Sequence, residues 1–115
     1  MDYSFDQYDK VDVLSVKGNV LTGIYNTEII GIVTEMIKQG SSKMIIQLGE
    51  VKFINSNGLN LLLNILTKYR KAGGEIVLSN VPDELTRLLV MTKLNSIFID
   101  RPNLQEAADY LKKAE

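Results

Sequence analysis

A buried strand gives way to a helix at Phe53-Ile54-Asn55-Ser56-Asn57-Gly58-Leu59. The apolar run upstream, Met44-Ile45-Ile46-Gln47-Leu48, is typical of a buried strand. Downstream, leucines recur at the spacing i, i+3, i+4 and i+7 of a helix packed on a sheet; they are Leu59, Leu62, Leu63 and Leu66. Because serine is among the best N-cap residues, we predict that Ser56 caps this helix.

Ser56 stands where a phosphate would be tolerated. An anion there would meet the positive end of the helix dipole and the free N–H groups of the first turn. Phosphorylation would add roughly two negative charges to the surface without breaking the helix. On residue type and spacing alone, however, a purely structural N-cap is the favoured interpretation.

Length and composition predict one small domain that spans residues 1–115. The chain has no cysteine, no histidine and a formal net charge of −1. It therefore lacks thiols, the commonest metal ligand and the commonest general base, and we expect neither catalytic residues nor a bound metal or cofactor. No long block of lysine or arginine supports nucleic-acid binding, so a protein partner is the better hypothesis.

The start of the chain, Met1-Asp2-Tyr3-Ser4-Phe5-Asp6, is acidic and lacks the basic-then-apolar order of a signal peptide. No apolar run approaches the length needed to span a membrane. We therefore expect a cytoplasmic protein with no membrane insertion.

Strand and helix patterns alternate after an initial hairpin. The hairpin is expected to turn at Asp9-Lys10. The remaining patterns predict a helix over 27–39, strands over 44–48, 76–78 and 97–99, a helix from Ser56 to the Gly73-Gly74 stop, a helix after Pro82, and a last helix after Asn103, which has capping-box spacing to Glu106. We predict an α/β fold with a mixed, mostly parallel sheet begun by the hairpin, and about four helices.

Three further segments lie in a fixed order relative to the Ser56 segment. They are Lys71-Ala72-Gly73-Gly74-Glu75 before a strand, Val81-Pro82-Asp83-Glu84-Leu85 at a helix start, and Leu94-Asn95-Ser96-Ile97-Phe98 at the entry to a late strand. Together with Ser56-Asn57-Gly58-Leu59 they are spread over residues 56–98. In their order and spacing, the chain resembles the STAS domains of the anti-sigma-factor antagonist type.

This resemblance implies a STAS fold and a switch operated by phosphorylation. The unphosphorylated protein would bind an anti-sigma factor serine kinase and so free a sigma factor. The kinase would phosphorylate Ser56 and release the antagonist, and a serine phosphatase would reset it. ATP and Mg²⁺ would belong to the kinase, so the chain would be a substrate and a binder and not an enzyme.

The chain departs from the family pattern close to the serine. The family usually has an acidic residue at the position of Asn55, a small residue at Asn57, and an acidic residue or two in the loop that contains Gly18-Asn19-Val20-Leu21. The missing carboxylate at Asn55 lowers the negative charge beside Ser56. We predict that this substitution changes recognition by the kinase.

The side of the helix away from the leucine stripe is the predicted partner-binding surface. We expect Leu61 and Ile65 to be partly exposed there, with an amide rim. Gly58 would either allow a close backbone approach or leave room for a partner to reach Ser56. The predicted surface comprises Asn55, Asn57, Gly58, Asn60, Leu61, Asn64 and Ile65. An exposed flank with no partner is the alternative.

Two other classes of function compete with the phosphorylation switch. A receiver-like phospho-acceptor needs carboxylates paired at strand ends to hold Mg²⁺, and Gly49-Glu50 after Leu48 offers no such pair. The alternative that stays open is an unphosphorylated STAS assembly subunit of a bacterial transporter or signalling complex, in which Ser56 only caps the helix.

Overall fold

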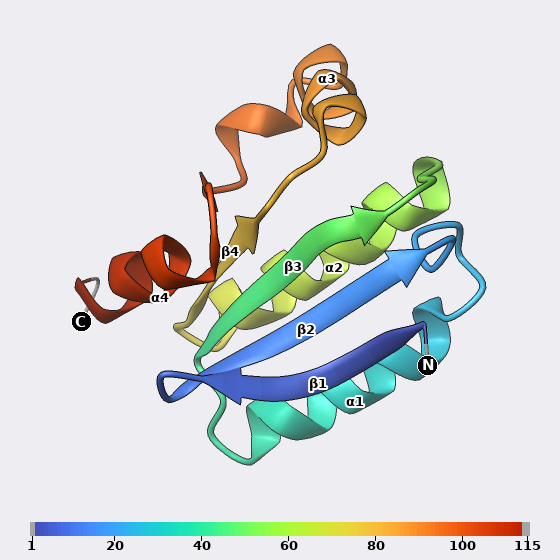
Figure 1. Cartoon of the computed structure of the whole chain (residues 1–115). Coiled ribbons are helices and arrows are strands. Elements are labelled where there is room, and N and C mark those ends of the chain that lie inside the picture. Colours follow the sequence, from blue (N-terminus) through green and yellow to red (C-terminus); the bar gives the residue numbers. More distant parts are fainter. Residues whose placement is uncertain (1, 114–115) are drawn as a thin grey trace.

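The computed structural model describes residues 2–113. It contains one five-stranded sheet in the order β1-β2-β3-β4-β5, with helices on both faces (Figure 1). The elements are β1 (Tyr3–Tyr8), β2 (Val11–Gly18), α1 (Asn26–Lys38), β3 (Lys43–Val51), α2 (Ser56–Lys71), β4 (Glu75–Ser79), α3 (Asp83–Met91), the 3₁₀ helix η1 (Leu94–Ser96), β5 (Asp100–Arg101) and α4 (Leu104–Lys113). The predicted α/β fold is confirmed.

The hairpin and the parallel strands are also as predicted. β1 pairs antiparallel with β2, and the strands β2 to β5 pair in parallel. Asp9 and Lys10 close the hairpin with φ angles of 54° and 70°. Two positive φ angles are the signature of the two-residue turn whose twist matches that of the flanking strands.

The sheet has a core on each face. α1 and α2 lie together behind the sheet in Figure 1 and cover one face through Leu14, Met44, Ile46, Leu48, Ile76 and Leu78. α4 covers part of the other face, where Ala107, Ala108 and Leu111 pack on Val11, Val13, Ile45 and Val77. The alternation of side chains along each strand supplies both cores.

The cap of α4 is confirmed, but the last strand was predicted in the wrong place. Asn103 Oδ1 accepts from Glu106 N at 2.9 Å, and its Nδ2 donates to Glu106 Oε2 at 3.2 Å. β5 lies after the apolar segment 97–99, of which Ile99 O still accepts from Leu78 N at 2.8 Å. Phe98 is buried as a core side chain. Of the three apolar residues, only Phe98 is buried and only Ile99 bonds to β4, so the apolar run did not mark the strand itself.

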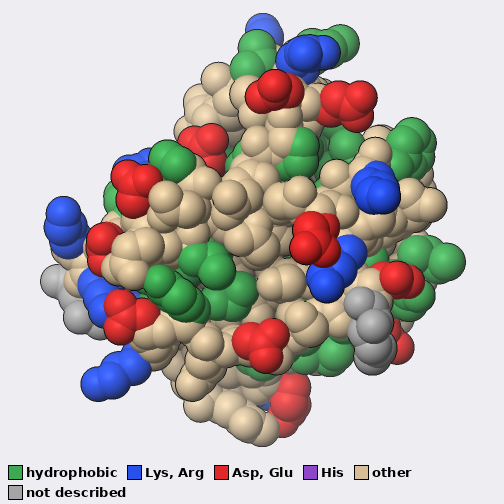
Figure 2. All heavy atoms as spheres, viewed as in Figure 1, with side chains coloured by type: hydrophobic (Ala, Val, Ile, Leu, Met, Phe, Trp, Pro, Cys, Tyr) green, Lys and Arg blue, Asp and Glu red, His purple; other side chains and the backbone are tan. Residues whose placement is uncertain are grey.

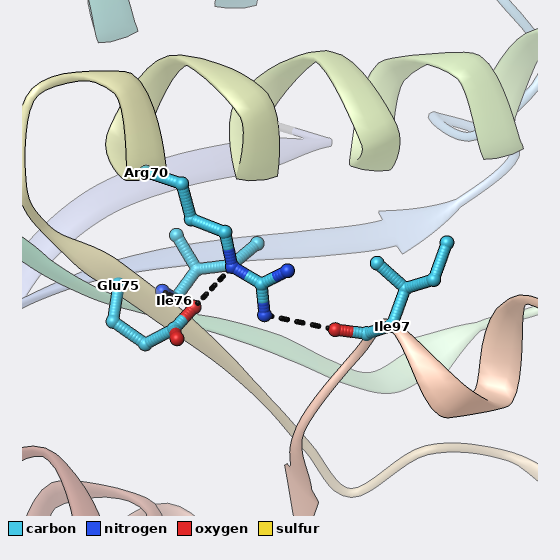
Figure 3. A network of polar contacts seen from close by, with 4 residues as sticks. All are labelled: Arg70, Glu75, Ile76 and Ile97. Atoms are coloured by element: carbon cyan, nitrogen blue, oxygen red, sulfur yellow. Dashed lines mark hydrogen bonds and ion pairs between the residues drawn. The ribbon is translucent and has the colours of Figure 1, made fainter.

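Arg70 fixes the end of α2 (Figure 3). Its Nε donates to Glu75 Oε1 at 3.1 Å and its Nη2 donates to Ile97 O at 2.9 Å. Glu75 Oε1 also accepts from Ile76 N at 3.0 Å. Arg70 therefore joins α2 to β4 and to the segment before β5.

Candidate functional site

The helix α2 is capped one residue earlier than predicted. Asn55 is the N-cap, with extended backbone, and its Oδ1 accepts from Gly58 N at 3.1 Å. The prediction that Ser56 is the N-cap is therefore wrong, because Ser56 is the first helical residue. Asparagine and serine cap equally well, so two such residues in succession cannot be told apart by type.

Ser56 is exposed at the positive end of α2. The first turn, Ser56–Leu59, contains no acidic residue. Leu59 N bonds to Asn55 O at 3.1 Å, while the N–H groups nearer the start have no earlier turn of helix to accept from them. The Ser56 hydroxyl is thus freed from capping and lies beside backbone donors that suit an added anion.

The loop of residues 19–25, which precedes α1, lies against the start of α2. Leu21 forms an isolated parallel bridge with Ile54, and its carbonyl accepts from Asn55 N at 3.1 Å. Asn55 Nδ2 donates to Thr22 O at 3.1 Å. Directly after the loop, Asn26, the first residue of α1, donates from Nδ2 to Asn57 O at 2.9 Å. Two segments that are far apart in sequence therefore form one surface.

Gly58 belongs to the contact between this loop and α2. A Cβ on Gly58 would lie 2.0 Å from Leu21 O, a separation that backbone atoms cannot tolerate. Gly58 is also buried. Of the two roles considered for this glycine, the structure favours close backbone approach, since no side-chain-sized opening toward Ser56 is left at Gly58.

Leu61 and Ile65 are not on an exposed flank, and this part of the predicted partner surface is wrong. Both side chains are fully buried in the core that α1, α2 and the sheet share. Leu62 and Leu66 are buried as predicted. α2 packs on the sheet with one stripe and against α1 with another, so it needs a wider apolar face than a helix with a single neighbour.

The polar part of the predicted surface is exposed. Asn57, Asn60 and Asn64 all lie on the outer side of α2. Two large apolar side chains near the serine were missed: Ile24, in the loop, is 72% exposed, and Phe53, just before the N-cap, is 54% exposed. Gly23, next to Ile24, lies against Asn57, which places this apolar residue close to the start of α2.

Two tyrosines join the loop and the start of α1 to β1 and to Asp2, the residue before it. The Tyr25 hydroxyl donates to Asp2 Oδ2 at 3.1 Å, and the Tyr3 hydroxyl donates to Glu28 Oε2. The hydrogen bond to Glu28, helped by burial, raises the pKa of Tyr3 to about 12. The bond to Asp2 likewise raises the pKa of Tyr25. A phenol is protonated at neutral pH even without such shifts, and the raised pKa values extend to higher pH the range in which both phenols donate.

Within residues 2–113, no group of acidic side chains is arranged to hold a metal ion. A hollow of about 490 Å³, lined by residues such as Asp12 and Ser41, lies at the opposite end of the sheet, where β2 and β3 begin. In the described part of the chain, no helix is long and apolar enough to cross a membrane.

The comparisons with known proteins agree with this architecture. The family model of the STAS domain matches residues 4–107. The fold is similar to that of a candidate anti-sigma factor antagonist from Thermotoga maritima, with 22% identity, a TM-score of 0.86, and 96% of this chain and 94% of that chain covered.

Two structures of the anti-sigma factor antagonist SpoIIAA are also similar. The unphosphorylated form shares 16% identity at a TM-score of 0.76, covering 98% of this chain and 99% of that one. The phosphorylated form, described as the Bacillus cell fate determinant, shares 18% identity at a TM-score of 0.73, covering 94% and 97%. With the family model matching almost the entire described chain, this protein belongs to the STAS domain family.

Proposed function

We propose that this chain is an anti-sigma-factor antagonist whose binding to an anti-sigma serine kinase is switched by phosphorylation of Ser56. One observation carries the proposal: Ser56 is exposed at the first position of α2, while Asn55 performs the capping. In the alternative, an unphosphorylated assembly subunit, the serine was expected to serve as the cap. With that role taken by Asn55, the helix start does not depend on Ser56.

The proposed docking surface consists of Ile24, Phe53, Ser56, Asn57 and Asn60, with Asn64 at its far end. It replaces the surface predicted around Leu61 and Ile65. Its two exposed apolar side chains would act as anchors, and its amides would form a polar rim. Such a surface is uncharged, which suits a partner that must distinguish a neutral serine from a phosphoserine.

The switch would act through charge and not through refolding. A phosphate on Ser56 would be stabilised in the free protein by the α2 dipole and by water. A kinase surface that fits the neutral serine would have to desolvate the anion without a matching partner, which costs several kcal/mol, roughly enough to release the complex. The similarity to the phosphorylated form of SpoIIAA supports a fold that survives this modification.

In this scheme the chain contributes no catalytic residue and no cofactor. The kinase supplies ATP, Mg²⁺ and the transfer chemistry, and a serine phosphatase removes the phosphate. The cycle would operate in the cytoplasm, where the kinase and its sigma factor meet the antagonist.

The direct test is to incubate the protein with the anti-sigma serine kinase of its own organism and ATP, and to map the product by mass spectrometry. We expect one added phosphate, on Ser56, and none in Ser56→Ala. Ser96→Ala, which removes another exposed serine, is the matched control and should be modified like the wild type. Phosphate on a different serine, or tight binding to a non-kinase partner without phosphorylation, would favour the assembly-subunit alternative.

A further inference from the structure

Asn55 uses every polar group of its side chain, and its backbone N–H, to join two segments. Its Oδ1 accepts from Gly58 N, its Nδ2 donates to Thr22 O, and its backbone N donates to Leu21 O, each at 3.1 Å. The first bond caps α2, and the other two hold the loop of residues 19–25. One residue therefore serves both as helix cap and as a clasp on the loop.

The clasp depends on the chemistry of an amide. An amide offers a donor and an acceptor at once, whereas an ionised carboxylate only accepts. An aspartate at this position would cap α2 as well as asparagine does. Its second oxygen, however, would face the carbonyl oxygen of Thr22, so a bond would be replaced by repulsion between two acceptors.

The exposed Ile24 lies between two attachments of this loop. On one side, Thr22 is held by the Asn55 amide; on the other, Asn26 Nδ2 donates to Asn57 O. Between them, Gly23 has a φ of 102° and lies against the Asn57 side chain. The attachments bracket Ile24 and fix where its side chain, 72% exposed, stands relative to Ser56.

We propose that Asn55 is a positioning residue: its Nδ2 donor locks the loop of residues 19–25 onto the start of α2, so that the docking surface is assembled before the partner arrives. The part that concerns the partner rests on the proposed function, while the locking of the loop does not. A preassembled surface binds more tightly because no loop has to be ordered on association.

The test compares Asn55→Asp with Asn57→Asp in the full chain. Both variants add the same charge to the start of α2, but only the first removes the donor to Thr22. In Asn55→Asp we expect amide hydrogen exchange in residues 20–27 to rise roughly tenfold, and affinity for the kinase to fall roughly three- to tenfold, the effect of one hydrogen bond. Exchange in β3 and in α2 beyond Gly58 should stay at the wild-type rate.

Asn57→Asp should keep wild-type exchange in the loop. Asn55→Ser is neutral and can still cap α2, and it should loosen the loop as Asn55→Asp does. It keeps the test valid if the carboxylate of Asn55→Asp disturbs folding. Wild-type exchange in both Asn55 variants, or an equal rise in Asn57→Asp, would overturn the clasp. A loosened loop with unchanged affinity would overturn preassembly. A wild type that binds no kinase would instead contradict the proposed function. The exchange experiment would still show whether the Asn55 amide holds the loop.

Discussion

The two ends of α2 are built from different interactions. At its start, neutral amides and backbone groups make the contacts: Asn55, Asn26 and the Leu21 carbonyl. At its end, the Arg70 guanidinium binds the Glu75 carboxylate and the Ile97 carbonyl. Arg70 at the end of α2 is already paired, whereas the neutral start of the helix offers an exposed hydroxyl. A single phosphate would therefore change the start of α2 far more than it would change the end.

The start of α2 also differs in charge from the face of the molecule drawn in Figure 2. On the face seen in Figure 2, acidic and basic side chains are interspersed over the molecule. The start of α2 is instead polar but uncharged from Asn55 to Asn64, apart from its buried apolar residues. A partner can therefore recognise this region by shape and amide hydrogen bonds, and a new charge there would change the binding.

The largest expected effect comes from charging the buried side of α2. Leu61→Asp should unfold the domain, because a carboxylate would replace a fully buried side chain. Leu61→Ala should cost about 2–5 kcal/mol in the free energy of unfolding, measured in urea. Asn64→Asp, one turn away on the exposed side, is the control and should unfold like the wild type. A stable Leu61→Asp protein would restore the exposed-flank interpretation.

The next effect concerns the contact between the loop and α2. Gly58→Ala should cost about 1–3 kcal/mol or more, because the added Cβ would collide with Leu21 O and with the Leu21 side chain. Gly31→Ala is the matched control: it lies in α1, where an added Cβ would meet no atom within 4 Å, and should gain about 0.5–1 kcal/mol. Urea denaturation of both variants measures the difference in their free energies of unfolding. Equal stabilities would show that the backbone at Leu21 can move away from the added Cβ at little cost.

A smaller effect on stability, with none on kinase binding, is expected from a change at the far end of α2. Arg70→Ala should cost about 1 kcal/mol in stability, a modest value because the pair with Glu75 is partly exposed. Its affinity for the kinase should equal that of the wild type, since Arg70 lies at the far end of the helix. Lys71→Ala provides the comparison for loss of a nearby exposed charge. Weakened kinase binding in Arg70→Ala alone would show that the docking surface extends along α2.

The smallest effect is a pH dependence of stability that arises from the hydrogen bond between Tyr3 and Glu28. The pKa of Tyr3 is raised to about 12 from 10.0, so its bond to Glu28 stabilises the fold below pH 10 and is lost as the pH rises toward 12. Tyr3→Phe should therefore be slightly less stable than the wild type near neutral pH, and this difference should vanish near pH 12. Unfolding midpoints at the two pH values measure it; a difference that persists at high pH would mean that the phenol does not act through this bond.

The sequence predicted the fold because its signals are local. Alternating strand and helix patterns, the Asp9-Lys10 turn and the pairing of Asn103 with Glu106 each depend on residues close together in the chain. The burial of Leu61 and Ile65 depends on where α1 lies, and helical periodicity alone does not reveal a second neighbour. For the same reason, the width of the apolar face was underestimated.

The place of Ser56 at a helix start was predicted correctly, but the contacts around it were not. Ser56 does lie at the start of the helix, yet the choice between Asn55 and Ser56 as cap depends on backbone angles that residue type does not fix. The exposure of Ile24 was not predicted from the sequence. Val20 and Leu21, which are apolar residues of the same loop, are buried, whereas Ile24 is exposed. An apolar residue in a loop does not disclose which side it faces.

A phosphate on Ser56 should release the partner without changing the fold. The most direct measurement is the affinity of the anti-sigma serine kinase for the unphosphorylated protein and for the purified Ser56 phosphoprotein, with the amide spectrum of each recorded alongside. We predict roughly a hundredfold or greater loss of affinity, equivalent to about 3 kcal/mol, with spectral changes confined to the start of α2 and the loop of residues 19–25. Equal affinity for the two forms would contradict the account, and so would spectral changes spread through the core.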